Sequence, residues 1–348
     1  MSGGIDSARD LLLINYEMSR KSQVFSHQLE TAILLSKSFS STIVISGKVE
    51  HGLAIDGVEI NSSQWVEGQN LRNSFRFLRQ VVPVLVRKRH LVVFSHMTNI
   101  QSLLLLPFTK VFRVKHFLWY AHASNHWSVK ILGRYLDGIL TSTPGSCPLK
   151  GERVFYLGQS VDPSKFKFKE DSTSPISKFV HVGRFDPSKK IESILSFMLE
   201  YRAKNPCATI EIVGSPSSSS LGSYQQAIFT QYSPRDSWVK FTPAIPRETL
   251  PGRLLQFDCF VHAFQGSLDK TLIEATMSGI PVITLNKEYE RIFGPWGELG
   301  NSLQNQVEYL NQLDLGKLHT ELARRRTLAS EEHSLNAWIS KTSSILKN

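Results

Sequence analysis

Two windows in the second half of the chain carry residue types suited to binding phosphate. In the first, residues 182–190 read VGRFDPSKK, so that a strand-like run ends in Gly183 and Arg184 and Lys189 follows five residues later. Glycine lets the backbone approach a ligand closely, Arg contacts a diphosphate through two parallel hydrogen bonds, and Lys adds a compact charge. This window predicts a diphosphate site, although a solvated basic turn uses the same residue types.

The second window, residues 264–285, reads FQGSLDKTLIEATMSGIPVITL and begins where another strand-like run ends. Ser267 is suited to cap a helix that runs to residue 278. The free N–H groups and the positive dipole end of such a helix bind phosphate. The phosphate-binding residues expected here are Gly266, Ser267, Leu268, Asp269 and Lys270.

Glu274 lies about two turns into this expected helix, where its carboxylate could accept hydrogen bonds from both hydroxyls of a ribose. The alternative is an exposed helix glutamate, which is the commoner fate of a single glutamate. No clustered Asp-x-Asp at a strand end offers a metal site. We therefore expect Arg184, Lys189 and the helix N-terminus to neutralise a diphosphate without a metal or any other cofactor.

The elements that would position these residues alternate along the whole chain. Short, nearly continuous apolar runs such as LVVFS at residues 91–95 and ATIEIV at residues 208–213 are separated by helical stretches. Such runs are typical of parallel strands that helices cover on both faces. The expected fold class is α/β, with two doubly wound, Rossmann-like domains facing each other across a cleft. In such sheets, ligands bind beyond the carboxyl ends of the strands.

Composition shifts divide the chain into parts. The first domain is expected to span residues 10–165, and residues 166–177, which are polar and lack periodicity, form a linker. The second domain spans residues 178–330. Residues 331–348 form a final amphipathic helix whose apolar positions, Trp338 among them, need a partner surface.

The overall composition is that of a folded protein. Of the 348 residues, 41% are hydrophobic and 20% are charged, close to the globular average. The three cysteines form no CxxC pair, so neither a disulfide framework nor a zinc site is expected. The first ten residues are polar, and no apolar run approaches the roughly 18 residues needed to span a bilayer. We expect a cytoplasmic protein.

The first half of the chain carries most of the net charge of +10. Arg20 and Lys21 follow the first strand-like run and could meet an anionic acceptor, or they could form a solvated turn. Residues 70–89 place several arginines at helical spacing beside aromatic and aliphatic side chains. That pattern suits an anionic membrane surface, such as the inner membrane face. The alternative is a helix that packs on its own sheet with its cations in water.

Together, the two windows resemble the retaining GT-B glycosyltransferases of family four, the group 1 glycosyl transferases. The C-terminal domain of that family carries a strand ending in Gly-Arg, a lysine five residues on and an E-A-M-A-x-G-x-P-V stretch. Here these appear as Gly183-Arg184, Lys189 and the stretch EATMSGIPV that begins at Glu274. The resemblance implies a nucleotide-sugar donor, with Arg184 and Lys189 on its diphosphate and Glu274 on its ribose.

The resemblance also implies hexosyl transfer with retention to a glycan or lipid-linked acceptor, as in polysaccharide biosynthesis. By the same resemblance, His122 would lie near the donor sugar as a catalytic residue, and His96, at another strand end, would line the cleft on the acceptor side. A lone histidine is more often structural. The last helix of the family crosses back to the first domain, which would bury Trp338 there.

One position departs from the family pattern. The family usually has a glutamate eight positions before the ribose glutamate, in contact with the transferred sugar, and this chain has Gly266 there. The donor sugar therefore stays open. Asp269 is also unfavourable beside a phosphate unless it points away or pairs with Lys270.

Two other classes of function remain at this stage. A sugar-nucleotide epimerase could use the same two-domain fold and would need no acceptor. A non-catalytic protein that binds nucleotides or nucleic acid would account for the sequence pI of about 9.5. The basic half lacks interleaved aromatic platforms and any recognisable nucleic-acid motif, so no nucleic-acid partner is expected.

Overall fold

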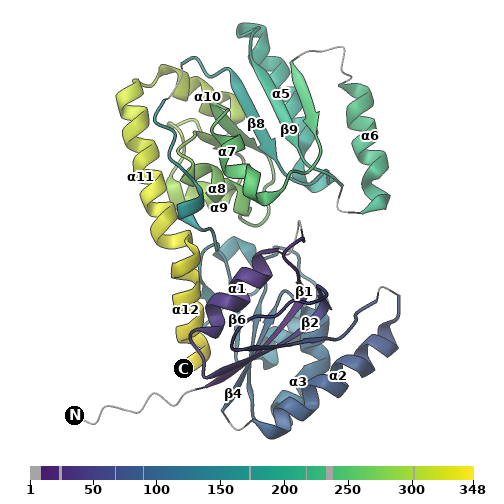
Figure 1. The fold of residues 1–348 in the computed structure, drawn as a ribbon. Helices are drawn as coiled ribbons and strands as arrows, with labels where there is room; N and C mark the ends of the chain where they lie inside the picture. The colour runs from purple at the N-terminus through teal and green to yellow at the C-terminus, as the bar shows by residue number, and fades with distance from the viewer. Residues whose placement is uncertain are drawn as a thin grey trace, which may run out of the picture. The chain divides into compact units, whose positions relative to one another are not determined.

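The computed structural model describes residues 9–348 except 23–25, 67, 89, 172–173, 217, 233–237 and 301. The chain forms two compact units (Figure 1). Unit 1 contains the residues up to Gly158 together with Trp338–Asn348, and unit 2 contains Gln159–Ala337. Each unit is built on one parallel β-sheet, in agreement with the expected α/β class.

The sheet of unit 1 has seven strands in the order β3-β2-β1-β4-β5-β6-β7, and every described pairing is parallel. The strands are β1 (Asp10–Met18), β2 (Ser41–Val49), β3 (Val58–Ser62), β4 (Leu91–His96), β5 (Lys115–Trp119), β6 (Gly138–Thr141) and β7 (Val154–Tyr156). The helices are α1 (Ser26–Ser36), α2 (Asn70–Arg87), α3 (Asn99–Val111), α4 (Trp127–Tyr135), η1 (Pro144–Ser146) and α12 (Leu335–Lys347).

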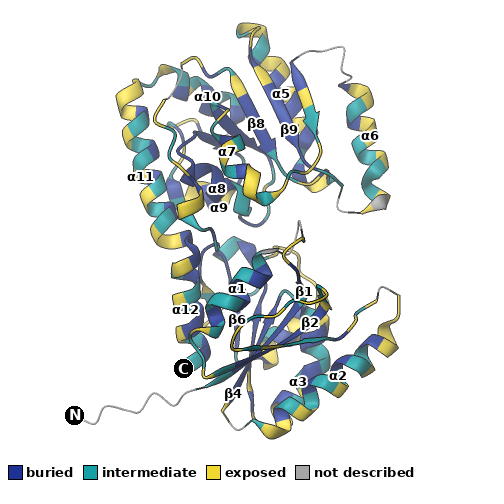
Figure 2. Cartoon of the chain, in the orientation of Figure 1, coloured by how far each residue is buried: buried dark blue, intermediate teal, exposed yellow. Residues whose placement is uncertain are grey.

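Both faces of this sheet are buried because successive residues of a strand point to opposite sides. On β1, Leu11 and Leu13 join a core with α1 and α12, whereas Leu12 and Ile14 join a second core with α2 and α3. Figure 2 shows the strands as buried elements among helices that expose their outer faces. This arrangement explains why the strand sequences are continuously apolar rather than alternating.

The sheet of unit 2 has five parallel strands in the order β10-β9-β8-β11-β12. They are β8 (Lys178–Val182), β9 (Thr209–Val213), β10 (Val239–Thr242), β11 (Cys259–His262) and β12 (Val282–Thr284). The α-helices are α5 (Ile191–Lys204), α6 (Gly222–Gln231), α7 (Leu250–Leu254), α8 (Lys270–Met277), α9 (Lys287–Phe293), α10 (Leu303–Gln312) and α11 (Leu315–His333). Short 3-10 helices are η2 (Pro163–Lys165), η3 (Pro187–Lys189), η4 (Ser219–Leu221) and η5 (Arg247–Thr249).

Two cores cover this second sheet in the same way. Phe179 and Val180 are neighbours on β8, and they belong to different cores. The first core includes side chains of α5, α6 and α10, and the second includes side chains of α7, α8 and α9. Unit 2 is therefore also a three-layer α/β structure.

The end of the chain contains two helices rather than the single one expected from residue 331. Ser334 forms a β-bridge with Val161, which separates α11 from α12. Trp338 of α12 is 1% exposed. Its ring lies 5.1 Å from that of Trp119 and 6.2 Å from that of Phe94, centre to centre. These contacts place α12 on the sheet of unit 1.

Each sheet carries a fully buried histidine on an interior strand. On β5, Nε2 of His116 lies 2.9 Å from Oγ of Ser95. On β8, Nδ1 of His181 donates to the carbonyl oxygen of Val261 at 2.9 Å. Loss of hydration lowers the pKa of both rings to about 3, with the charges of Lys110 and His262 as the next causes for His116 and His181 respectively. Both rings are neutral at ordinary pH.

No helix among the described residues is long and apolar enough to cross a bilayer.

Candidate functional site

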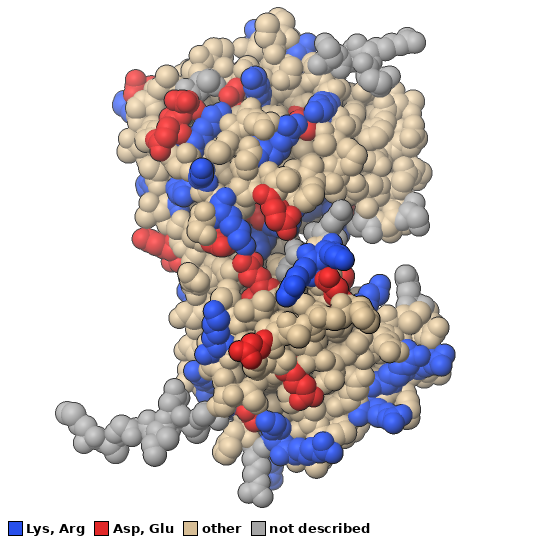
Figure 3. All heavy atoms as spheres, in the orientation of Figure 1, with Lys and Arg blue, Asp and Glu red and all other residues tan. Residues whose placement is uncertain are grey.

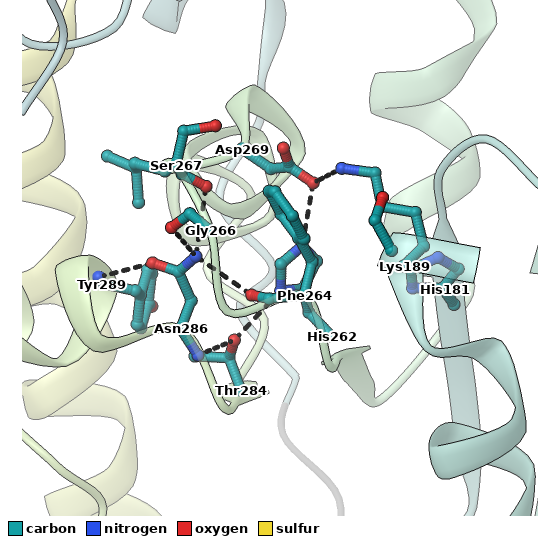
Figure 4. Close-up of polar contacts among 12 residues, drawn as sticks. His181, Lys189, His262, Phe264, Gly266, Ser267, Asp269, Thr284, Asn286 and Tyr289 are labelled. Carbon is teal, nitrogen blue, oxygen red and sulfur yellow. Dashed lines mark hydrogen bonds and ion pairs between the residues drawn. The ribbon is translucent and has the colours of Figure 1, made fainter. Parts of the chain in front are cut away.

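The strand order of unit 2 contains one switch point, between β8 and β11. From β8 the chain moves outward to β9 and β10, and it then returns to place β11 on the other side of β8. Ligands bind in open α/β sheets in the crevice outside the carboxyl ends of the strands at such a point. Here, residues 183–190 follow β8 and residues 263–269 follow β11, so both windows singled out in the sequence meet at one edge of the sheet (Figure 4).

The loop after β8 begins with a glycine for a steric reason. The amide of Gly183 donates to Val213 O at 3.0 Å, and a Cβ at position 183 would lie 2.8 Å from Nε2 of His181. The neighbouring strand approaches equally closely, since a Cβ on Gly214 would lie 1.8 Å from Gly183 O. The next side chain, Arg184, is exposed. Its guanidinium is therefore available to solvent and to ligands.

Lys189, unlike Arg184, is buried, with 6% of its surface exposed. It ends η3, whose start is capped by Asp186 through a bond from the amide of Ser188 at 2.9 Å. The Nζ of Lys189 lies 3.9 Å from the centre of the Phe264 ring. A cation over an aromatic face is attracted by the ring quadrupole. Two windows 75 residues apart in sequence are thus in direct contact.

Asp269 is the second partner of Lys189. Its Oδ2 accepts hydrogen bonds from Nζ of Lys189 at 2.5 Å and from Nε2 of His262 at 3.0 Å (Figure 4). Burial raises the pKa of the Asp269 carboxyl, but His262 and Lys189 outweigh burial and hold the pKa well below its usual range. Asp269 is therefore ionised at neutral pH. Lys189 and His262 are the partners that hold this carboxylate in the described residues.

Helix α8 starts later than the sequence indicates. Its N-cap residue is Asp269 and its first helical residue is Lys270, so Ser267 is not the cap. The cause is Asn286, just after β12, whose Nδ2 donates to the carbonyl oxygens of Phe264, Gly266 and Ser267 at 3.1 to 3.2 Å. These bonds keep the loop extended until residue 269. The sequence signal for Asn286 is its position two residues after the end of a third strand, β12.

Glu274 on α8 is buried, with 2% of its surface exposed, so the alternative of an exposed helix glutamate is wrong. Its Oε1 accepts from the guanidinium of Arg247 on η5. Its Oε2 is buried and has no hydrogen-bond partner among the described residues. An unpartnered buried carboxylate oxygen is costly unless a ligand donates to it. The sequence does not point to Arg247, because no motif surrounds it and it lies 27 residues before Glu274.

The remaining members of the second window shape the loop. A Cβ on Gly266 would lie 2.3 Å from the Phe264 ring, so that ring can remain beside Lys189 only if residue 266 is a glycine. Ser267 and Leu268 are buried. The carbonyl oxygen of Leu268 accepts from Nε2 of Gln159 at 2.6 Å. These residues contribute backbone rather than side chains to the switch point.

Unit 1 has its own switch point, between β1 and β4. Arg20 and Lys21 follow β1 and are exposed. The amide of Arg20 donates to Glu50 Oε2 at 2.7 Å, and Lys21 Nζ lies 3.9 Å from Glu50 Oε1. The bond from Arg20 is the main cause that lowers the pKa of Glu50. The backbone of Arg20 and the ammonium group of Lys21 thus lie beside one carboxylate.

The two histidines singled out in the first half differ in their surroundings. His96 ends β4, is 4% exposed, and its ring stacks on Trp119 at 6.2 Å between centres. That is a packing position. His122 is exposed and lies 5.7 Å from the Tyr120 ring, centre to centre. Of the two, only His122 can reach a ligand without a change of packing.

Within the part of the chain that the structure describes, no group of three or more His, Cys, Asp and Glu side chains has a metal-binding arrangement.

No family model matches the chain. No curated protein matches it either. Solved structures do match over nearly the whole length. The Anabaena protein HepE in complex with UDP and glucose is 14% identical, with a TM-score of 0.71 over 97% of this chain and 98% of that chain.

Sucrose-phosphate synthase from Thermosynechococcus elongatus is 12% identical, with a TM-score of 0.75 over 97% of this chain and 98% of its own. A glycosyltransferase from Rickettsia africae is 11% identical, with a TM-score of 0.73 over 98% of both chains. At such low identity the likeness shows the fold. The two parallel α/β units are those of the GT-B fold.

Proposed function

We propose that the chain is a glycosyltransferase that takes its sugar from a nucleoside-diphosphate sugar bound at the switch point of unit 2. The observation that carries this proposal is the buried Glu274 on α8, whose Oε2 has no partner among the described residues. Helix α8 begins directly after Asp269, which pairs with Lys189 of the other window. The solved neighbours support it, since HepE was crystallised with UDP and with UDP-glucose.

Each group has a role that its surroundings permit. Arg184, exposed beside the glycine loop, is suited to bind the diphosphate through two parallel hydrogen bonds. Helix α8 begins after the end of β11 at the same edge of the sheet, and a helix N-terminus favours an anion. Glu274 Oε2 is suited to accept a ribose hydroxyl. Together these groups would stabilise the charge that develops on the departing nucleoside diphosphate.

The finer features of the proposal are hexosyl transfer with retention, to a glycan or lipid-linked acceptor and without a metal. They rest on the resemblance of the sequence motifs. Fixed cations and helix N–H groups can replace a metal in neutralising a leaving diphosphate. His122 is the proposed catalytic residue in unit 1, and Arg20 and Lys21 are the proposed acceptor contacts, because all three are exposed.

A panel of ligands tests the donor proposal. Thermal shift and calorimetry with UDP, GDP, ADP and CDP should show stabilisation by one of them, because a ligand that binds only the folded state raises its stability. Turnover of the matching nucleotide sugar should require an acceptor and should persist in EDTA. Conversion without an acceptor would favour the epimerase, and activity lost in EDTA and restored by magnesium would refute metal independence.

We also propose that unit 1 contacts an anionic membrane surface through α2. One face of this helix, with Phe77, Val81 and Leu85, is buried in the core of unit 1. On that face the helix packs on its own sheet, as one of the two sequence interpretations expected. Its outer face exposes Leu71 by 89% and Phe75 by 69%.

Arg72, Arg79 and Arg87 on α2 are also exposed, and the helix has no acidic residue. Figure 3 shows Lys and Arg gathered over the part of unit 1 where α2 lies. Exposed apolar side chains among basic ones favour anionic headgroups. Arg89, the end of the basic stretch, lies outside the described residues.

A further inference from the structure

The charge of Lys189 is already matched before any donor arrives. Its Nζ lies 2.5 Å from Oδ2 of Asp269, and the side chains of the two residues are 7% and 22% exposed. Phe264 covers the ammonium group at 3.9 Å. Charges so far removed from water attract each other more strongly than a surface pair does. A phosphate that approaches Lys189 therefore meets a neutral pair and not a free cation.

Asp269 does not make the contact that its place in the fold would favour. It is the N-cap residue of α8, with φ −76° and ψ 140°, but its side chain accepts no hydrogen bond from the first turn of the helix. Asp at an N-cap usually accepts such a bond. The carboxylate is turned instead toward Lys189 and His262. The side chain of Asp269 therefore does not cap the first turn of α8.

A diphosphate and this carboxylate would use the same lysine. A phosphate oxygen in hydrogen-bond contact with Lys189 Nζ would lie close to Oδ2 of Asp269, and two anions at that distance repel each other. His262 does not relieve the conflict, since its Nε2 is bonded to the same Oδ2.

We propose that Asp269 is a built-in counter-ion that competes with the donor diphosphate for Lys189 and so sets how tightly the site holds nucleoside diphosphates. This inference rests on the proposed function and deepens it. Donor binding then requires the carboxylate to leave Lys189. The N-cap position offers the carboxylate another place, because a change of side-chain rotamer allows it to cap α8.

Two substitutions of Asp269 test this competition in the full chain. Asp269→Asn and Asp269→Ser both remove the charge and keep a good N-cap residue, so α8 can still start at the same place. Calorimetry with UDP and with inorganic pyrophosphate should show binding at least about tenfold tighter in both variants, a change of about 1.4 kcal/mol. Uridine, which has no phosphate, should bind as it does to the wild type. Because Asn and Ser differ in size, either variant suffices if the other fails to fold.

Lys189→Met supplies the second arm of the test. If the gain comes from freeing Lys189, it must disappear when Asp269→Asn is combined with Lys189→Met, which gives a double-mutant cycle. Glu308→Gln is the matched control, because Glu308 also pairs with a lysine of unit 2, Lys204, at 3.0 Å. This control should leave the affinity for both phosphates unchanged.

The outcomes separate the counter-ion from the donor site. Unchanged UDP and pyrophosphate affinity in the folded Asp269 variants overturns the competition, and weaker binding would make Asp269 a ligand contact instead. Both results leave the proposed function in place if the wild type binds UDP. A gain for pyrophosphate with no binding of any nucleoside diphosphate would keep the counter-ion role and remove the proposed function.

Discussion

At the scale of single residues, Glu274 and Arg184 are assigned to different parts of one ligand. Glu274 is buried beside Arg247, whereas Arg184 is exposed. A buried carboxylate with one unpartnered oxygen is suited to a hydroxyl, and an exposed guanidinium to a diphosphate. Substitutions of the two should therefore differ in which fragment of the nucleotide they affect.

Glu274→Gln should weaken UDP and uridine alike but not pyrophosphate, and Arg184→Gln should weaken UDP and pyrophosphate but not uridine. Each lost charge-assisted hydrogen bond should cost about 1.5 to 3 kcal/mol, measured by calorimetry. Arg291→Gln, on the exposed side of α9, is a control that should change nothing. If both variants bind all three ligands like the wild type, the donor-site assignment is wrong.

At the scale of elements, α12 closes one face of the sheet of unit 1. Trp338 lies in the core that also contains Leu11 on β1 and Leu346 at the end of α12. Its ring contacts Trp119, Phe94 and His96. The final segment of the chain is thus part of the core of unit 1 and not an appendage.

Trp338→Ala should destabilise the protein by about 3 to 5 kcal/mol, because it removes a large side chain from a closed core. The measurement is denaturant unfolding followed by far-UV circular dichroism. Trp127→Ala on α4 is the matched control, since Trp127 is 59% exposed and should cost little. Equal effects of the two substitutions would show that α12 does not hold this face of the sheet.

Strand positions were the part of the fold that the sequence predicted best. A continuous apolar run of five or six residues bounded by polar residues, such as the one within β4, is too short for a buried helix and is therefore read as a strand. β3 was missed because VEINS alternates and is half-exposed at the sheet edge. The break at Ser334 was missed because it depends on pairing with Val161, which is far away in sequence.

Site residues were predictable where a motif was local, and they were missed where a contact joins distant segments. Gly183 and Lys189 follow the end of β8, and the second window follows the end of β11, so the strand positions alone bring these two loops to one edge of the sheet. Asn286 fixes the loop before α8 through three bonds across about 20 residues. No local pattern shows such bonds, and so the start of α8 was placed too early.

At the scale of the whole molecule, the positive charge and the exposed face of α2 give a testable surface. Anionic vesicles should bind the protein, and neutral vesicles or high salt should release it, because screening shortens the range of the attraction. The double substitution Arg72→Gln and Arg79→Gln should reduce binding by about 1 kcal/mol per arginine. Lys130→Gln with Arg134→Gln on α4 removes equal charge from the same unit and should have less effect.

Sedimentation measures this binding directly. Equal binding to neutral and anionic vesicles, or loss of binding in the α4 control as large as in the α2 variant, would remove the membrane proposal and leave the exposed face of α2 unexplained.

The buried histidines make both sheets sensitive to acid. Once unfolded, His116 and His181 would titrate near pH 6.5, but in the folded chain their pKa is about 3. Between these values the unfolded chain binds more protons, so stability is full above about pH 6.5 and falls as pH drops, by about 1.4 kcal/mol per pH unit for each ring.

Acidification from pH 7 to pH 5 should therefore lower the free energy of unfolding. His181→Gln removes one of the two rings, so the free energy of unfolding should change less steeply with pH, by about 1.4 kcal/mol per pH unit. This holds whatever the substitution does to stability at pH 7. An unchanged slope would mean that the ring of His181 takes up its proton while the sheet stays folded. Such a protein keeps its fold best where pH is held near neutrality, and a fall in pH weakens it from within its two sheets.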